Sequence, residues 1–424
     1  NVKAVYYGHA SVGLIHIRPE LNLSKKKDQE IMYSIAKDVS KIVKKYHGSL
    51  SGEHGDGRIR APFLKEQFGK VVYQYFVDLK HTFDPKNLFN PGVILSDTSI
   101  LENLRPVISQ QELTTAFDWR DDLSFYYAVE KCNGAGVCRK SIGGIMCPSY
   151  KATRGEEFST RGRANLLRKA LSSEDPTKSL KNSELKEALD LCLACKACKS
   201  ECPANVDMAK LKSEYLFQIR NAGSYVKSWH IKNLGYILKI GSKAPDTFNF
   251  LQSSFLGRKL IGFERQPPLL QKKSLSDWWS ACKTNNEDCS TTVWVIVDIF
   301  TQYYDVSIGQ DVLNLLKKCK VNIKVVFPKN SIVAMVSYGL LNEAKNELKI
   351  LHSQLNDAAK NDLIVGIEPS EVLVWRDEAK SLLNGRLPNV LLFEELLLEL
   401  DQLKVLPKFH ALNTKVWVYE HCHQ

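Results

Sequence analysis

The stretch Cys192-Leu-Ala-Cys195-Lys-Ala-Cys198-Lys-Ser-Glu-Cys202-Pro203 has the spacing C-x2-C-x2-C-x3-C-P. This spacing wraps three thiolates around one cubane iron–sulfur cluster and sends the fourth thiolate to a neighbouring cluster. The alternative, a structural zinc site, normally uses two separated C-x2-C pairs. The motif therefore predicts a [4Fe–4S] cluster.

An incomplete copy of this motif lies upstream. Cys132-Asn-Gly-Ala135-Gly-Val-Cys138, followed by Cys147-Pro148, has Ala135 in place of the middle cysteine and a longer last spacer. By the cross-ligation rule, the proline-flanked Cys147 supplies the fourth ligand of the downstream cluster. The cluster that this predicts has four thiolate ligands: Cys147, Cys192, Cys195 and Cys198.

The reciprocal site is short of one cysteine. It could hold a three-iron cluster, a four-iron cluster with a non-cysteine ligand, or no cluster, in which case its cysteines are buried thiols. Its three candidate ligands are Cys132, Cys138 and Cys202. The segment 153–163 between the two motifs is rich in basic and hydroxyl groups. It is either a source of hydrogen bonds to cluster sulfurs or a solvated helix cap.

Composition limits the remaining possibilities. The chain has 424 residues, 44% hydrophobic and 25% charged, which at roughly 100–200 residues per domain allows two to four domains. Lys and Arg (58) exceed Asp and Glu (47), but they are spread along the chain, so no nucleic-acid partner is expected. The richest apolar run, Val390–Leu400, contains three glutamates and is too short and too polar to span a membrane.

Cysteine usage and the first residue also carry information. Seven of the eleven cysteines fall between Cys132 and Cys202 in metal-type spacings, which indicates reduced thiols and a cytoplasmic protein. Cys282, Cys289 and Cys319 lack partners at ligand spacing and are interpreted as ordinary core or surface residues. The chain starts at Asn1, with neither an initiator Met nor a signal pattern, and is therefore expected to be a piece of a longer polypeptide.

The patterns along the chain predict a multidomain protein. Short β-rich runs surround a helix in which Ile31, Ile35, Val39 and Ile42 recur at helical spacing, and Gly48 is placed to end it. The cysteine-rich part reads as helical, and after residue 290 strands alternate with helices, which favours a parallel α/β domain. That part closes on VWVYE, predicted as a strand, followed by His421, Cys422 and His423. The predicted divisions are 1–98 (α+β), 99–118 (linker), 119–225 (helical, ferredoxin-type), 226–290 (helical and polar connector) and 291–424 (α/β, truncated).

Two short elements near the start carry candidate metal ligands. In GHASVGLIHIR, His16 and Arg18 are two apart on a strand and share one face, which His9 reaches if the chain turns near Gly13. The alternative is a pair of satisfied core histidines. In SGEHGDGR, glycines bracket Glu53 and His54 and permit a bend that brings both side chains to one site, unless the segment is simply a flexible polar loop.

These two elements, followed by FDPKNLFNPG at residues 83–92, resemble the C-terminal substrate domain of FAD-linked oxidases of the vanillyl-alcohol-oxidase type. With the cysteine motifs behind them, the chain resembles the C-terminal part of long D-2-hydroxyacid dehydrogenases that contain FAD and a [4Fe–4S] cluster. Its last part is similar to the start of the cysteine-rich domain of heterodisulfide-reductase-like proteins. The resemblance implies FAD, held mainly by an upstream domain, a [4Fe–4S] cluster, and a divalent metal such as zinc.

The resemblance also assigns roles to residues. It implies that the divalent metal is bound by His9, His16 and Glu53. His54 matches the active-site histidine, and Asn90 lies in the segment that approaches the flavin. Arg18 stands where some relatives carry Asn in an H-x-N pattern. By their chemistry Arg18 and Arg58 are candidates to bind the substrate carboxylate.

The activity implied is oxidation of a D-2-hydroxyacid to the 2-oxoacid. His54 would act as the base and the flavin as hydride acceptor, and electrons would leave through the cluster to a quinone or an electron-transfer protein. D-2-hydroxyglutarate is favoured over D-lactate because Arg18, Arg58 and Arg60 supply more cations than one carboxylate needs. The alternative is a non-catalytic iron–sulfur subunit of a flavoprotein dehydrogenase. A cytoplasmic location, peripheral association with the inner membrane face and oligomer formation are all compatible with this reading.

Overall fold

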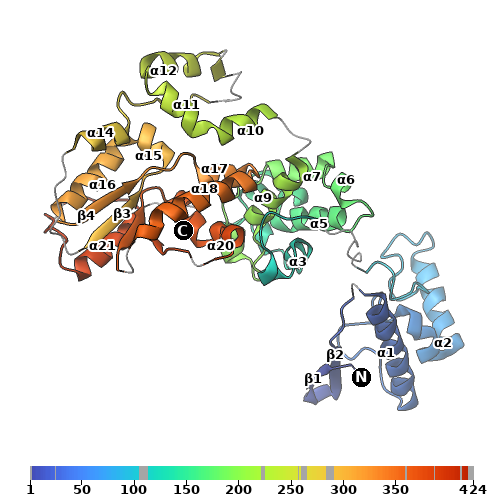
Figure 1. The fold of residues 1–424 in the computed structure, drawn as a ribbon. Helices are drawn as coiled ribbons and strands as arrows, with labels where there is room; N and C mark the ends of the chain where they lie inside the picture. Colours follow the sequence, from blue (N-terminus) through green and yellow to red (C-terminus); the bar gives the residue numbers. More distant parts are fainter. Residues whose placement is uncertain are drawn as a thin grey trace. The chain divides into compact units, whose positions relative to one another are not determined.

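The computed structural model describes residues 2–23, 25–104, 113–220, 225–255, 257–258, 265–282, 291–358, 361–385, 387–410 and 413–418. The chain divides into two compact units, residues 1–110 and 111–424 (Figure 1). Residues 421–423 and Cys289, which the sequence analysis singled out, lie outside the described residues. None of the helices in the described ranges is both long and apolar enough to cross a bilayer.

The first unit is an antiparallel hairpin followed by two long helices. Strands β1 (Ala4–His9) and β2 (Leu14–Pro19) are joined by a 3-10 turn at Ala10–Val12. Gly13 closes this turn in the left-handed region, with φ 61°. Helix α1 spans Lys26–Lys45, and α2, kinked at Gly69, spans Ala61–Phe83.

The end of α1 differs in detail from the prediction. His47, not Gly48, adopts the left-handed conformation, with φ 56°. The N–H groups of His47 and Gly48 donate to the carbonyls of Lys44 and Val43 at 3.1 and 2.8 Å, which is the Schellman arrangement. The predicted helix is confirmed, but the left-handed residue comes one position earlier because this motif places it just before the residue that closes the outer hydrogen bond.

The second unit begins with short helices around the cysteines. They are α3 (Phe125–Glu130), α4 (Pro148–Thr153), α5 (Thr160–Leu171), α6 (Pro176–Ser179), α7 (Ser183–Asp190), α8 (Ala197–Glu201) and α9 (Met208–Ile219), with 3-10 turns at Arg120–Asp122, Val137–Arg139 and Glu156–Phe158. Helices α10 (Tyr225–Lys232), α11 (Leu234–Gly241), α12 (Pro245–Ser253) and α14 (Leu275–Ala281) follow. Side-chain oxygens cap several helix starts, as Ser124 does for α3 and Ser159 for α5.

The rest of the second unit is a four-stranded parallel sheet with helices packed against it, as the alternation of strands and helices predicted. Its strands are β3 (Thr292–Ile296), β4 (Asn322–Val326), β5 (Leu363–Gly366) and β6 (Val390–Leu391), in the order β4-β3-β5-β6. The helices are α15 (Ile299–Tyr303), α16 (Val306–Lys318), α17 (Ile332–Ser337), α18 (Leu341–Gln354), α19 (Pro369–Arg376), α20 (Glu378–Leu383) and α21 (Phe393–Gln402), with a 3-10 turn at Leu355–Asp357.

The core of this sheet explains why its strands are nearly continuous apolar runs. Val293 and Val295 of β3 pack with Leu313 of α16, Leu396 of α21 and Leu275 of α14, all fully buried. Parallel strands are buried on both faces, so polar alternation is absent from them. Cys319 is buried in the same core, as expected of an ordinary core thiol.

The strand predicted at VWVYE does not form in its described part. Val416, Trp417 and Val418 have no regular secondary structure and are 75%, 94% and 84% exposed. β-propensity alone does not make a strand, because a strand needs a neighbouring chain to satisfy its backbone groups.

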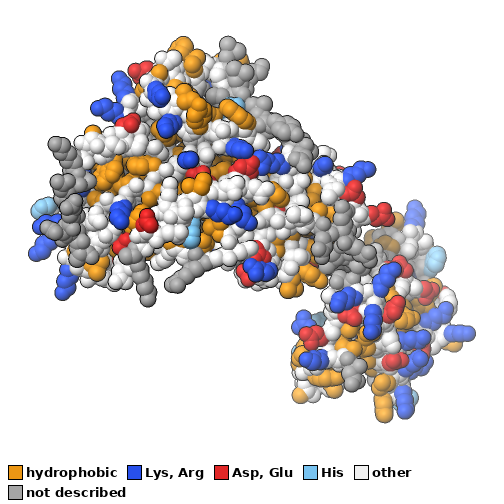
Figure 2. Space-filling view, viewed as in Figure 1, with side chains coloured by type: hydrophobic (Ala, Val, Ile, Leu, Met, Phe, Trp, Pro, Cys, Tyr) orange, Lys and Arg blue, Asp and Glu red, His pale blue; other side chains and the backbone are white. Residues whose placement is uncertain are grey.

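On the face seen in Figure 2, basic and acidic side chains are interspersed.

Candidate functional site

The hairpin brings the two candidate histidines to one face. His9 pairs with Leu14 and Tyr7 pairs with His16, so His9 and His16 are diagonal neighbours across the two strands. Their ring centroids are 5.3 Å apart. Tyr7, which the sequence analysis did not single out, stacks on His16 with ring centroids 4.6 Å apart.

The glycine-rich loop places Glu53 against this pair. Gly52 lies so close to Leu14 of β2 that an added Cβ would be 2.5 Å from the Leu14 Cδ1 atom. Gly55 and Gly57 have φ of 71° and 57°, which side-chain-bearing residues rarely adopt. The bend that the glycines were expected to allow is therefore present, and it depends on their lack of a side chain.

Glu53 is the centre of the resulting cluster. Its Oε1 atom lies 3.3 Å from the Nε2 of His9, 3.1 Å from the Nε2 of His16 and 3.1 Å from the Nε2 of His54. One ligand atom from each of His9, His16 and Glu53 falls within 4.8 Å of the others, a spacing that suits one divalent cation. The His54 side chain is 73% exposed and is accessible to a substrate.

The other predicted residues of this unit lie on neighbouring loops. The Nη2 of Arg58 donates to the carbonyl of Pro91 at 3.4 Å, and the N–H of Ile94 donates to the carbonyl of Gly57 at 3.0 Å. These bonds join the Glu53 loop to the segment that carries Asn90, which is exposed. Arg18 is exposed on β2, two residues beyond His16.

Asp84 explains the shape of the FDPKNLFNPG segment. Its carboxylate accepts the backbone N–H groups of Leu88 and Phe89, each at 2.8 Å, and pairs with Lys80. The Lys80 hydrogen bond, with the two backbone N–H groups, lowers the pKa of Asp84 to about 2. A charged acceptor at this position fixes the turn that leads to Asn90.

In the second unit, four cysteines from two distant motifs line one small cavity. Cys147 from the upstream motif faces Cys192, Cys195 and Cys198 from the downstream motif. This is the set that cross-ligation predicted. In the described part of the chain, no three cysteine sulfurs all lie within 4.8 Å of one another, whereas three or more thiolates on a single zinc ion, with Zn–S bonds of about 2.3 Å, would do so. The residues present therefore fit a larger cluster better than one zinc ion.

Two of these sulfurs accept hydrogen bonds. The backbone N–H of Met208 donates to the Sγ of Cys198 at 3.4 Å, and the Nη1 of Arg163 donates to the Sγ of Cys147 at 3.7 Å. Burial raises the pKa of the Cys198 thiol to about 12, so iron must displace its proton on binding. Arg163 lies in the basic segment 153–163, for which sequence left open a role as a source of such hydrogen bonds.

The three cysteines of the possible second site are less clearly grouped. Cys132 and Cys138 are buried, and burial, with smaller effects of Cys147 and Cys132, raises the pKa of the Cys138 thiol. Cys202 is the residue after α8 and is not among the side chains that line the described cavity. The Nη1 of Arg161 donates to the carbonyl of Gly134, next to Ala135. A second cluster stays a prediction.

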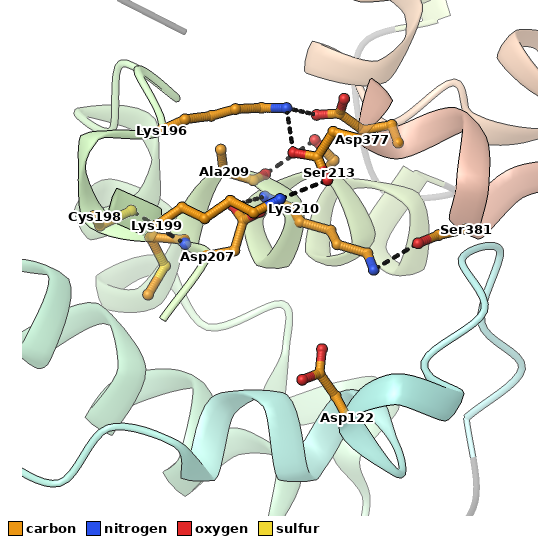
Figure 3. A network of polar contacts seen from close by, with 12 residues as sticks. Asp122, Lys196, Cys198, Lys199, Asp207, Ala209, Lys210, Ser213, Asp377 and Ser381 are labelled. Atoms are coloured by element: carbon orange, nitrogen blue, oxygen red, sulfur yellow. Dashed lines mark hydrogen bonds and ion pairs between the residues drawn. The ribbon is translucent and has the colours of Figure 1, made fainter. Parts of the chain in front are cut away.

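A network of ion pairs joins the cluster loop to the sheet part of the same unit (Figure 3). The Nζ of Lys196 lies 2.8 Å from Asp377 and also pairs with Glu378, while the Nζ of Lys199 lies 2.6 Å from Asp377. Lys210 donates to the Oγ of Ser381 at 2.8 Å. The carboxylates come from the start of α20, some 180 residues from the lysines, and no sequence pattern pointed to them.

Comparison with known protein families gives counterparts to the first unit and to the cysteine-rich part of the second. Residues 1–94 match the family of FAD linked oxidases, C-terminal domain. Residues 128–206 match the family of 4Fe-4S dicluster domains. The first span contains His9, His16, Glu53, His54 and Asn90, and the second contains the seven clustered cysteines.

Several similar proteins are named D-2-hydroxyglutarate dehydrogenase. The one from Escherichia coli is 30% identical over 88% of this chain, and that from Haemophilus influenzae is 27% identical over 91%. The one from Pantoea ananatis is 28% identical over 98%. The chain spans 42–46% of the length of these relatives.

A glycolate oxidase subunit from Bacillus subtilis matches only 20% of the chain, at 30% identity. No solved structure matches. The chain therefore carries a FAD-linked oxidase C-terminal domain followed by a 4Fe–4S dicluster domain, in a sequence similar along most of its length to D-2-hydroxyglutarate dehydrogenases.

Proposed function

We propose that the protein to which this chain belongs oxidises a D-2-hydroxyacid, with D-2-hydroxyglutarate favoured, and passes the electrons through a [4Fe–4S] cluster to a quinone or another carrier. The observation that carries the proposal is the group of His9, His16 and Glu53 with His54 beside it, within residues that match FAD linked oxidases. The names of the similar proteins support the substrate class.

In this proposal the chain's residues orient the substrate and take its hydroxyl proton. His9, His16 and Glu53 would hold a divalent cation such as zinc, which acidifies a hydroxyl bound to it. Arg18, on the face of β2 that carries His16, would pair with a carboxylate of the substrate. The segment that carries Asn90 would lie beside bound FAD, whose flavin would supply the acceptor for the hydride on C2 of the substrate.

His54 is placed to act as the base. Its Nε2 lies 3.1 Å from the Oε1 of Glu53, so an N–H there donates to the carboxylate. That tautomer leaves the lone pair on Nδ1, which takes the hydroxyl proton of the substrate. The negative charge of Glu53 would then also stabilise the imidazolium that forms on His54. Carboxylates that accept a hydrogen bond from a histidine commonly orient its ring and raise its basicity in this way.

The alternative, a non-catalytic iron–sulfur subunit, accounts for fewer observations. It explains the four cysteines of the cavity but gives no use to the histidine cluster on the hairpin. The match of residues 1–94 to FAD linked oxidases also counts against it.

The test uses the full-length enzyme with D-2-hydroxyglutarate. Because a positioned general base contributes about 10²–10⁴-fold, His54→Gln should lower kcat/KM by that factor with bound metal retained. Glu53→Ala should lose both the metal and the activity, with metal content measured by atomic absorption.

His81→Gln, at an exposed histidine of α2, is the matched control and should leave both quantities unchanged. Undiminished turnover in His54→Gln, or full activity in protein that binds no divalent metal, would contradict the proposed roles.

A further inference from the structure

Arg163 is the most buried cation near the cluster cysteines, with a side chain only 2% exposed. It projects from the first turn of α5. Its Nε donates to the carbonyl of Ala188 at 2.6 Å, its Nη2 donates to the Oγ of Ser149 at 2.8 Å, and its Nη1 donates to the Sγ of Cys147 at 3.7 Å. All three guanidinium nitrogens therefore have an acceptor, and one of these acceptors is a cysteine sulfur.

Within the described residues, no Asp or Glu forms an ion pair with Arg163, whereas two other cations of this region have such a partner. Arg168 pairs with Glu130, and Lys196 pairs with Asp377 and Glu378. A buried charge without a counter-charge costs several kcal/mol, and neutral acceptors offset only part of that cost. The acceptor of Arg163 that can carry a full negative charge is the sulfur of Cys147, as a thiolate bound to iron.

We infer that Arg163 is the counter-charge of the iron–sulfur cluster, acting through the sulfur of Cys147, and that it favours the reduced state. This inference rests on the proposed function, in which the cluster held by Cys147, Cys192, Cys195 and Cys198 accepts electrons one at a time from the reduced flavin. Reduction adds one electron and no proton, so the negative charge of the cluster and its thiolates grows by one. A fixed buried cation stabilises that extra charge more than it stabilises the oxidised form.

The lysines of the cluster loop do not take this role. Lys196 and Lys199 also stand beside ligand cysteines, but Asp377 and Glu378 largely neutralise them. Burial by itself would lower the pKa of Lys196, yet the two carboxylates outweigh it and raise the pKa. The charge of Arg163, in contrast, is not offset by a carboxylate among the described residues, and so it acts on the cluster. It is a positioning and tuning residue, since it contacts a ligand sulfur and not the iron.

The experiment is an EPR-monitored redox titration of the full-length enzyme and its variants, with iron and acid-labile sulfide measured in each. Arg163→Gln keeps a hydrogen-bond donor and removes the charge. It should shift the equilibrium between oxidised and reduced cluster about tenfold toward the oxidised form, which for one electron is a potential lower by about 59 mV. Arg163→Lys keeps the charge and should stay near the parent potential with the cluster retained.

Lys186→Gln is the matched control, because it removes an exposed cation that already pairs with Asp190 in the same unit, and its potential should not move. A cluster that the substrate-reduced flavin does not reduce would refute the proposed electron path and not the role of Arg163, whereas a parental enzyme without a cluster would refute both. An unshifted potential in Arg163→Gln, or equal loss of the cluster from the Gln and Lys variants, would overturn the inference, since charge would then not be what Arg163 supplies.

Discussion

At the scale of single residues, Glu371 is a partly buried acid whose ionisation should make stability depend on pH. Its carboxylate accepts the N–H of Ile332 at 3.2 Å and also bonds to Ser331, and burial, with a smaller effect of Asp298, raises its pKa to about 8. The folded chain therefore keeps this proton up to about pH 8, while the unfolded chain loses it near pH 4.5. Its contribution to stability is complete below the lower value and is lost as the pH rises through the higher one.

The change that tests this is Glu371→Gln, which stays neutral at every pH. In the parent, the free energy of unfolding should fall by at most about 1.4 kcal/mol per pH unit between the two pKa values, and the variant should show a flatter profile. Urea unfolding at about pH 5 and about pH 9 measures the difference. Identical pH profiles for parent and variant would show that Glu371 ionises in the folded chain as it does in the unfolded one.

At the scale of elements, residues at the junction of α19 and α20 hold the cluster loop in place through ion pairs and hydrogen bonds. Asp377 is the residue between the two helices and pairs with Lys196 and Lys199, while Ser381 of α20 accepts from Lys210 and its carbonyl accepts the N–H of Asp118. Removing one partner of a fully buried ion pair costs about 3–5 kcal/mol, and the cost here should be smaller, because Asp377 is partly exposed and Lys196 keeps Glu378 as a partner. Asp377→Ala should therefore lower the temperature at which cluster absorbance is lost by several degrees.

The control for the Asp377 variant is Asp190→Ala, which removes the acid of the exposed Lys186–Asp190 pair. Exposed pairs are worth about 1 kcal/mol or less, so the temperature should barely change. If the two variants lost the cluster at the same temperature, the contacts of Asp377 would have no special weight in holding the loop.

At the scale of the whole molecule, what could be predicted from sequence depended on how local the signal was. The α1 helix, the apolar parallel strands and the grouping of Cys192, Cys195 and Cys198 follow from residues close together in the chain. The cross-ligation rule extended this to Cys147, although 45 positions separate it from Cys192. In contrast, the contact of Lys196 with Asp377 depends on how helices dock, and the strand predicted at VWVYE lacks a pairing partner among the described residues.

The candidate substrate site was predicted in the same uneven way. Strand alternation and glycine positions predicted that His9 could share a face with His16 and that Glu53 and His54 could share one site, while the resemblance to FAD-linked oxidases implied that the two elements belong together, as they do in the structure. They did not separate the roles of Arg58 and Arg60 from that of Arg18. Arg58 and Arg60 lie outside regular structure, where the direction of a side chain follows no sequence period. Arg60 donates to the carbonyl of Gly55 at 2.7 Å and so holds the loop itself, which removes it from the cations that sequence counted toward a second carboxylate.

Because Arg60 holds the loop, the prediction for the substrate of the complete enzyme depends on Arg18. Arg18, which shares the strand and face of His16, is expected to contact substrate, and a charged hydrogen bond is worth about 1.5–3 kcal/mol, or about 10–150-fold. If Arg18 binds the distal carboxylate, Arg18→Ala should lower kcat/KM for D-2-hydroxyglutarate by that factor and leave D-lactate nearly unchanged. Arg60→Ala loosens the loop that carries Glu53 and should lower kcat/KM for both acids alike. Equal losses for the two acids in Arg18→Ala would mean that Arg18 binds the carboxylate they share, and an unmodified enzyme that uses D-lactate equally well would refute the dicarboxylate preference.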